Sequence, residues 1–260
     1  MRKVSKTQGE NALTRFRNSF PTGTWNDFRA SNSGRDYKEI KKLIFDDQLE
    51  ICAYCEVECS IQGNNRRVEH FKSKSGCDVN VDNWNLDWNN LIGVCFGGQE
   101  RKNKEFYDLP ENLSCDAHKE YYENQNKITD KDWTGKILYP LNDPIDNRFF
   151  ELNIGNGKLA PNESFCSKIN IDGNKHDTTT KLVENTISVL NLNCDRLCDA
   201  RKVFCNQLQA TINKAKKSND IQIVRNLVIR WSKGKVDYFQ TTRDILIRQN
   251  VITSKIVIQV

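Results

Sequence analysis

Long apolar runs are missing from this sequence of 260 residues, and the residues that break regular structure are scarce. No stretch of about 18 apolar residues occurs, which argues against a transmembrane helix and a membrane partner. Proline occurs 5 times and glycine 13 times, while 37% of the residues are hydrophobic. This composition excludes a collagen-like, low-complexity or wholly disordered chain. The length suffices for one large domain or two modest ones with a buried core.

An apolar segment typical of a secretory signal peptide is also absent. The first residues, Met1-Arg2-Lys3-Val4-Ser5-Lys6-Thr7-Gln8, carry charges with no apolar run behind them. We therefore expect a cytoplasmic protein. What the sequence does contain is 10 cysteines. In a reducing compartment, clustered cysteines indicate a metal site before they indicate disulfides.

Charge is unevenly distributed along the chain. Residues 1–180 hold 25 basic and 28 acidic residues, whereas residues 181–260 hold 14 basic and 6 acidic ones, a net charge of +8. A basic C-terminal part on a nearly neutral body favours a polyanion partner or an acidic protein surface. Ordinary solvated helices would produce the same pattern, so charge alone does not decide.

Hydrophobic patterning predicts an α+β protein with three regions. Residues 1–50 form an N-terminal helical arm, residues 51–145 a loop-rich middle with short strands, and residues 146–260 a hairpin followed by helices. The helical part of the last region is expected to dock a partner or grip nucleic acid. Within the arm, the spacing of Tyr37, Ile40 and Ile44 predicts a helix from about Asp36, its N-cap, to about Leu49.

The C-terminal region contains most of the predicted helices. A stop signal at residues 140–144 precedes an alternating segment at residues 146–175 that suits a hairpin. Apolar positions then predict helices over 182–190, 197–212 and 221–231, the last ending near Gly234. Residues 251–260 are rich in valine and isoleucine and fit either a strand or a last helical turn.

The cysteine spacing predicts a zinc site. Cys52 and Cys55 are separated by two residues, which on a tight turn directs two thiolates at one point and makes half of a tetrahedral site. Cys95 and Cys115, at the two ends of a polar loop over residues 96–114, are the preferred second pair. A redox motif is the other interpretation of the first pair, but no strand–helix context of the thioredoxin type surrounds it.

The other six cysteines are treated separately. Cys59 and Cys77 are alternative ligands, and Cys166 is isolated. Cys194, Cys198 and Cys205 follow helical spacing beside apolar positions, where free cysteine behaves as a small hydrophobic residue, so we expect them in a helical core.

Between the two cysteine pairs, Glu69 directly precedes His70. A neutral imidazole can take a proton from water near pH 7, so His70 is the candidate general base for hydrolysis. Glu69 supplies a hard oxygen ligand suited to Mg²⁺ or Mn²⁺. Adjacent strand residues point to opposite faces, so the two can serve one site only if the strand ends or bulges there.

The order of these motifs resembles that of the HNH endonucleases. A cysteine pair is followed by Glu69-His70, by Asn90-Leu91 and by Cys115-Asp116. The resemblance implies a ββα-metal core with a structural zinc clamp. It also implies that Asp116 is the second ligand of the divalent ion, and that Asn90 fixes the His70 ring or its loop. His118 is the alternative to Asp116, while Asn85 and Asn89 compete with Asn90.

A closer resemblance is to the PtuB-type HNH nucleases of Septu and retron anti-phage defence systems. The matching landmarks are Asp47-Gln48, residues 51–56, Glu69-His70-Phe71, residues 88–91, Cys115-Asp116 with Lys119, and residues 190–193 followed by Arg201. This resemblance implies a nucleic acid substrate, DNA or RNA, and an ABC/SMC-like ATPase partner of the PtuA type. In retron versions it also implies a reverse transcriptase and its reverse-transcribed DNA.

Basic residues close to the motifs are candidates for nucleic acid contact. Lys72, Lys74 and Lys119 could approach phosphates, although surface lysines are common. A zinc-stabilised nucleic-acid-binding or adaptor subunit without catalysis is the alternative function. That alternative needs the four cysteines but does not need Glu69, His70 and Asn90 together.

Overall fold

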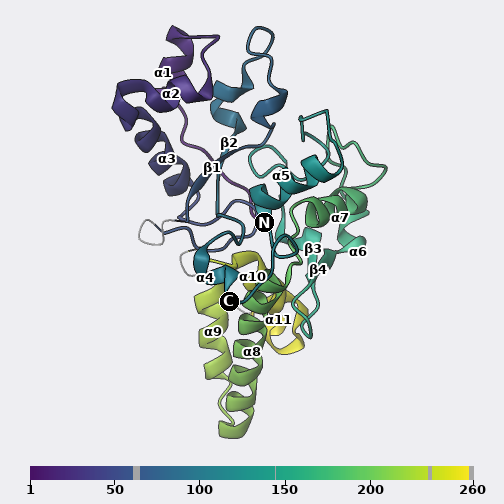
Figure 1. Ribbon diagram of the computed structural model, residues 1–260. Helices are drawn as coiled ribbons and strands as arrows, with labels where there is room; N and C mark the ends of the chain where they lie inside the picture. Colours follow the sequence, from purple (N-terminus) through teal and green to yellow (C-terminus); the bar gives the residue numbers. More distant parts are fainter. Residues whose placement is uncertain (61–64, 144, 234–235, 258–260) are drawn as a thin grey trace.

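The structure, a computed structural model shown in Figure 1, describes residues 1–60, 65–143, 145–233 and 236–257. Helices dominate, and the described strands form two small antiparallel sheets, which confirms a mixed α+β protein. The strands are β1 (Arg67–His70), β2 (Leu91–Val94), β3 (Phe150–Leu152) and β4 (Leu159–Pro161). The helices are α1 (Ala12–Ser19), α2 (Trp25–Ala30), α3 (Arg35–Asp47), α4 (Arg101–Lys104), α5 (Cys115–Gln125), α6 (Glu163–Cys166), α7 (Thr179–Val189), α8 (Asp195–Ser218), α9 (Gln222–Ser232), α10 (Gln240–Gln249) and α11 (Val251–Val257).

Helices α1 to α3 gather at one end of the molecule (Figure 1). Capping boxes begin the first two: Asn11 pairs with Thr14 at α1, and Thr24 pairs with Asp27 at α2. The helix predicted from about Asp36 to about Leu49 is present as α3, but Asp36 as its N-cap is wrong. Gly34, in the left-handed conformation at φ 79°, precedes Arg35, and Asp36 lies in the first turn. Its carboxylate accepts hydrogen bonds from Ser31 and Asn32, which binds it to the preceding turn.

The hairpin of β1 and β2 lies between these helices and α5 (Figure 1). Glu69 pairs with Ile92 and His70 with Leu91 in the antiparallel register. Leu91 belongs to a buried cluster that also contains Leu13, Trp25 and Phe28 of the N-terminal helices. The arm therefore shares a core with the hairpin and is held rigidly against it.

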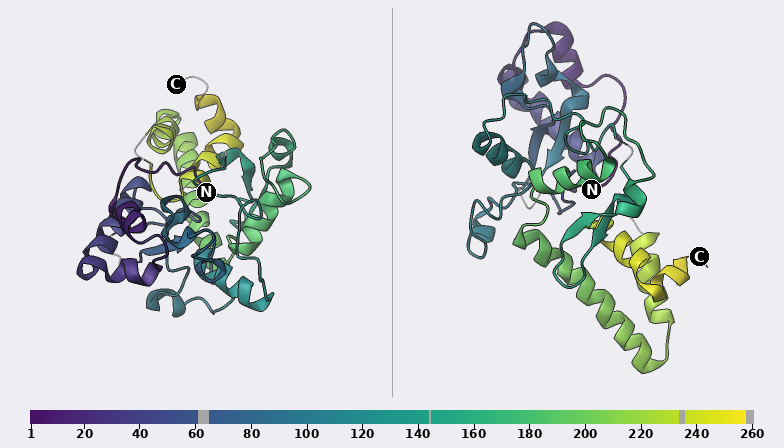
Figure 2. Two further views of the ribbon diagram at one scale, coloured as in Figure 1. Left: turned by 90° about the horizontal axis from the view of Figure 1, so that it is seen from above. Right: turned by 90° about the vertical axis from the view of Figure 1, so that its right-hand side faces the viewer.

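The C-terminal region follows the predicted order. The hairpin predicted at residues 146–175 appears as β3 and β4. The three predicted helices appear as α7, α8 and α9, and α8 and α9 project together from the rest of the molecule (Figure 2). Residues 251–257 are helical, which decides between the two alternatives, while residues 258–260, Pro144 and Gly234 lie outside the described residues.

Contacts far apart in sequence join the middle region to the C-terminal helices. The buried Glu56 carboxylate accepts a hydrogen bond of 2.7 Å from the backbone N–H of Thr241 in α10. The larger hydrophobic cluster accordingly runs from the first residues to Ile256. Among the described helices, none is both long and apolar enough to cross a bilayer.

Candidate active site and metal centre

Four buried cysteines meet at one point, as the spacing predicted. The Sγ atoms of Cys52 and Cys115 are 3.8 Å apart, those of Cys55 and Cys95 3.7 Å, and those of Cys95 and Cys115 3.9 Å. All four sulfur atoms lie within 4.8 Å of one another. A tetrahedral zinc ion with Zn–S bonds of about 2.3 Å requires sulfur atoms about 3.8 Å apart. The distances thus fit a Zn²⁺ site and are far too long for disulfides.

Two local features bring these cysteines together. The first pair sits on a tight turn, where the Cys52 N–H bonds to the Val57 carbonyl at 3.0 Å. The second pair is joined across the intervening loop because Gly97 packs against Ser114. Gly97 has φ +63°, and a Cβ there would lie 2.3 Å from the Ser114 carbonyl oxygen. This close approach closes the loop over residues 96–114 at its base, so the loop does not separate its two cysteines.

The remaining cysteines do not join the cluster. Cys59 is buried with its thiol directed at the Val57 carbonyl, and Cys77 is half-buried with its thiol directed at the Asp82 carbonyl. Cys194, Cys198 and Cys205 are buried among the C-terminal helices, which confirms their predicted core position.

A cation that the sequence did not suggest lies near the cluster. Burial lowers the pKa of the Arg196 guanidinium, but the charges of Cys95 and Cys55 outweigh burial and raise it overall. Arg196 also donates a hydrogen bond of 2.7 Å to the Ser114 hydroxyl. Four thiolates around one Zn²⁺ would carry a net negative charge, which this arginine would partly offset.

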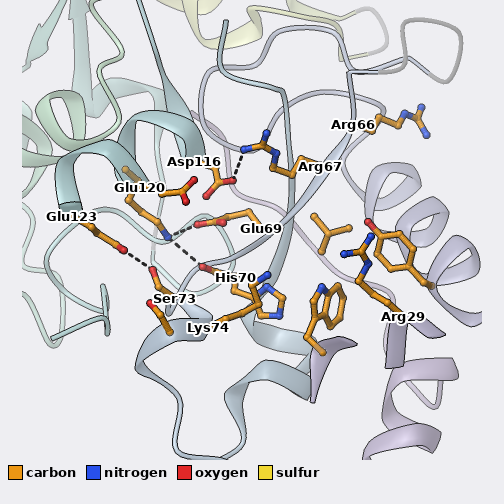
Figure 3. A pocket seen from close by; sticks show the side chains of 15 residues that line it. Arg29, Arg66, Arg67, Glu69, His70, Ser73, Lys74, Asp116, Glu120 and Glu123 are labelled. Atoms are coloured by element: carbon orange, nitrogen blue, oxygen red, sulfur yellow. Dashed lines mark hydrogen bonds and ion pairs between the residues drawn. The ribbon is translucent and has the colours of Figure 1, made fainter. Parts of the chain in front are cut away.

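Three of the predicted catalytic residues open on a pocket of about 630 Å³ (Figure 3). Glu69 and His70 at the end of β1, and Asp116 in the first turn of α5, all line it. Because β1 ends at His70, the alternation of strand side chains does not continue beyond it, and both Glu69 and His70 reach the pocket. The structure thus meets the condition set out from the sequence, that the strand must end or bulge here for Glu69 and His70 to serve one site.

His70 is held as a neutral, oriented imidazole. Burial lowers its pKa to about 3. Its Nε2 atom lies 3.0 Å from the backbone carbonyl oxygen of Asn85, and the Trp25 ring packs edge-on against it with centroids 4.6 Å apart. A carbonyl oxygen only accepts, so Nε2 carries the proton and Nδ1 keeps the lone pair. An imidazole in this state can accept a proton from water.

Asn90 holds the loop that follows His70 rather than the ring itself. Its side-chain amide donates to the carbonyl oxygens of Lys72 at 3.1 Å and Trp84 at 2.9 Å, and its Oδ1 accepts from the Lys72 N–H at 2.7 Å. The ring is oriented instead by the backbone of Asn85. The Asn90 amide thereby links the segment after β1 to the segment whose Asn85 carbonyl oxygen orients the His70 ring.

A buried carboxyl group, that of Glu69, faces the half-buried one of Asp116 in the pocket. Burial and the charge of Asp116 raise the pKa of Glu69 well above its ordinary value. Asp116 accepts a hydrogen bond of 3.2 Å from Arg67, which itself donates to Gln99 at 2.9 Å. The Lys119 ammonium pairs with Glu69. Burial raises the pKa of Asp116, but the hydrogen bond with Glu69 and the charges of Lys119 and Arg67 outweigh burial and lower it overall. An ionised carboxylate beside a second carboxyl group whose charged form is disfavoured is an arrangement that a divalent cation relieves.

The periodicity of α5 separates the candidates on it. Asp116, Lys119, Glu120 and Glu123 are spaced three or four residues apart and all line the pocket. His118 lies on another face, where its Nδ1 is 2.8 Å from the Val189 carbonyl oxygen of α7. His118 is not among the residues that line the pocket with Glu69. The structure therefore does not bring His118, the alternative metal ligand, to the pocket that Glu69 and Asp116 line.

The three predicted phosphate-binding lysines have different environments. Lys74 is exposed and lines the pocket. Lys72 forms an ion pair of 3.4 Å with Asp132 and does not line it. Lys119 is only 2% exposed, so it is not a surface lysine as expected; besides Glu69, its ammonium contacts the carbonyl oxygens of His70 and Phe71 at 3.2 and 3.1 Å.

Sequence reasoning missed the contribution of the N-terminal arm to this pocket. Trp25 and Arg29 of α2 and Tyr37 of α3 line it opposite α5. Their sequence signal is weak, because an isolated tryptophan, arginine or tyrosine on a helix carries no spacing that indicates a site. Only the packing of the arm against the hairpin reveals them.

Comparison with known proteins identifies the family. The chain is 44% identical over 253 residues, 97% of this chain and 96% of the other, to an Escherichia coli protein named as the candidate HNH endonuclease of retron Ec83. A second relative, from Vibrio cholerae serotype O1 biovar El Tor, is named as the candidate HNH endonuclease of retron Vc95 and is 30% identical over 98 residues, 33% of this chain and 46% of the other. No protein-family profile matches the chain. The protein belongs to the family of retron-associated HNH endonucleases.

Proposed function

We propose that this protein is a metal-dependent HNH endonuclease that hydrolyses phosphodiester bonds of nucleic acid as the effector of a retron anti-phage defence system. One observation carries the proposal. A neutral imidazole whose Nδ1 keeps its lone pair and two carboxyl groups from separate elements open on one pocket. The retron names of the two relatives support the biological setting.

Each residue then has a chemical role. His70 accepts the proton of the attacking water at Nδ1, and Asn90 keeps the segment behind it in place. Glu69 and Asp116 hold Mg²⁺ or Mn²⁺, an ion that, when bound, neutralises charge at the scissile phosphate and the leaving oxygen. Cys52, Cys55, Cys95 and Cys115 hold a structural Zn²⁺ that joins the start of α5 to β2, and so Asp116 to the hairpin. Lys74 contacts the phosphate backbone.

The proposed partners follow from the family and from charge. We propose an ABC/SMC-like ATPase of the PtuA type, together with a reverse transcriptase and its reverse-transcribed DNA. Residues 181–260 carry a net charge of +8, and α8 and α9 project from the molecule, where a large partner has access (Figure 2). The same projecting basic helices support the alternative, a catalytically silent zinc-stabilised binding or adaptor subunit.

Cleavage assays separate these two functions. The protein is purified with and without its neighbour-encoded ATPase, supplied with Mg²⁺ or Mn²⁺, and offered DNA and RNA. His70→Ala is compared with wild type, and His176→Ala, outside the pocket, is the matched control. We expect cleavage by wild type and His176→Ala only. Equal cleavage by His70→Ala would reject the base assignment, and no cleavage under any activation would favour the adaptor.

A further inference from the structure

A group of cations forms the wall of the pocket that the N-terminal arm contributes. Arg29 of α2 and Arg66, just before β1, line the pocket on the side away from Glu120 and Glu123 (Figure 3). Lys41 lies one helical turn beyond the lining residue Tyr37 on α3. These three cations come from three segments that lie outside the zinc cluster and outside the Glu69–Asp116 pair.

Two of these cations have no acidic partner. Arg29 is exposed, and its guanidinium carbon lies 5.1 Å from the centre of the Tyr37 ring. Within the described residues, neither Arg29 nor Lys41 makes an ion pair or a side-chain hydrogen bond. Arg66, by contrast, pairs with Glu50 at 2.6 Å and is 7% exposed. It is therefore fixed in position, while the other two are available to a ligand.

The cations repel one another in the free protein. Burial lowers the pKa of Lys41, and the positive charges of Arg66 and Arg29 lower it further. Arg29 and Lys41 have no acidic partner among the described residues, and an anion bound between such like charges removes their repulsion. An acidic peptide would also meet Glu120 and Glu123 across the pocket. The phosphodiester backbone of a nucleic acid can reach the cations while its scissile phosphate faces the carboxylates of Glu69 and Asp116.

We propose that Arg29 and Lys41, supported by the fixed Arg66, bind the phosphodiester backbone of the nucleic acid substrate beside the scissile phosphate. This proposal rests on the proposed nuclease function. It adds residues of the N-terminal arm to the surface that binds the substrate. Tyr37 holds the Arg29 guanidinium by a cation–π contact, so the arginine is presented toward the pocket at reduced entropic cost.

Binding measured in the absence of cleavage tests this subsite. In a His70→Ala background, a labelled single-stranded DNA, an RNA of the same sequence and the DNA duplex are titrated by fluorescence anisotropy from about 50 to about 200 mM salt. The test variant is Arg29→Gln/Lys41→Gln. The matched control is Arg101→Gln/Lys102→Gln, which removes two positive charges from the exposed helix α4, whose residues do not line the pocket. Zinc content and circular dichroism verify that both variants fold.

We expect the test variant to bind at least one of the strands more weakly and with a smaller salt dependence. Each phosphate contact on a single strand contributes about 0.7 to the slope of log K against log salt, so losing two lowers it by about 1.4. The control should keep the wild-type slope. The nucleic acid, DNA or RNA, whose affinity falls more in the test variant is the one that this subsite binds.

The other outcomes separate failure of this subsite from failure of the nuclease function. Wild-type affinity and slope in the test variant, or an equal loss in the control, would reject the subsite even if the protein cleaves. Loss of ATPase co-purification with unchanged oligonucleotide binding would assign the cluster to a protein surface instead. A reduced slope without any cleavage by the His70-containing protein would keep the subsite and reject the nuclease.

Discussion

Replacing Lys119 with methionine should make the stability of the fold depend on a divalent ion. The Lys119 side chain is buried, its ammonium pairs with Glu69, and it donates to two backbone carbonyls at 3.1 and 3.2 Å. Lys119→Met keeps a long apolar side chain but leaves the Glu69 carboxylate buried without its cation. Breaking a buried pair in this way costs about 3–5 kcal/mol. For a chain of this size the loss corresponds to a fall in Tm of about 6–20 °C.

Calorimetric unfolding of four proteins tests this reasoning. Wild type, Lys119→Met, Glu69→Gln and the double variant are compared with zinc present and no added Mg²⁺. The double variant should recover most of the loss, because an uncharged glutamine does not need the ammonium. Excess Mg²⁺ should recover part of it in Lys119→Met, because the ion takes the place of the lost cation beside Glu69 and Asp116.

The control is Lys181→Met, which breaks the exposed pair with Glu184 and should change Tm little. Two results would refute the reasoning. One is a fall in Tm for Lys119→Met no larger than for the control. The other is simple addition of the two single-variant losses in the double variant, which would mean that Lys119 and Glu69 do not interact.

The remaining predictions concern zinc, the metal ligand and pH. Cys52→Ser should lower the zinc-to-protein ratio measured by mass spectrometry and unfold the middle region, whereas Cys77→Ser should keep the zinc; full retention in Cys52→Ser would point to other ligands. His118→Ala should cleave like wild type while Asp116→Ala does not, and a loss of cleavage in His118→Ala would return that histidine to the site. Burial lowers the pKa of His70 to about 3, so the rate of cleavage should show no acid limb from His70 near its ordinary pKa of about 6.5. The unfolded chain binds this proton first as pH falls, so without added divalent metal the buried His70 should reduce the free energy of unfolding below about pH 6.5, by about 2 kcal/mol at pH 5. Denaturant unfolding at several pH values, compared with His70→Gln, measures this, and equal pH dependence of the two proteins would contradict it.

Elements with strong local signals could be predicted from the sequence. The helix over α3 and the helices α7 to α9 repeat apolar residues at helical spacing, so their existence followed without tertiary information. Helix α10 was missed, because its buried residues include Thr241, Thr242 and Arg243, whose polarity hides the period. The N-cap at Gly34 was missed for a related reason, since a nearby aspartate is the stronger capping signal in the sequence.

The sequence by itself determined the four cysteines, the Glu69-His70 pair and the order of motifs. Two-residue spacing on a turn and adjacency at a strand end are local geometry, so they carry through to the folded protein. Tertiary structure alone decided that Asp116 rather than His118 faces the pocket, because that depends on how α5 is rotated against the hairpin. It also decided that the Asn85 carbonyl orients His70 and that Arg29 lines the pocket. Such contacts join segments distant in the chain, and side-chain packing, not spacing, brings them together.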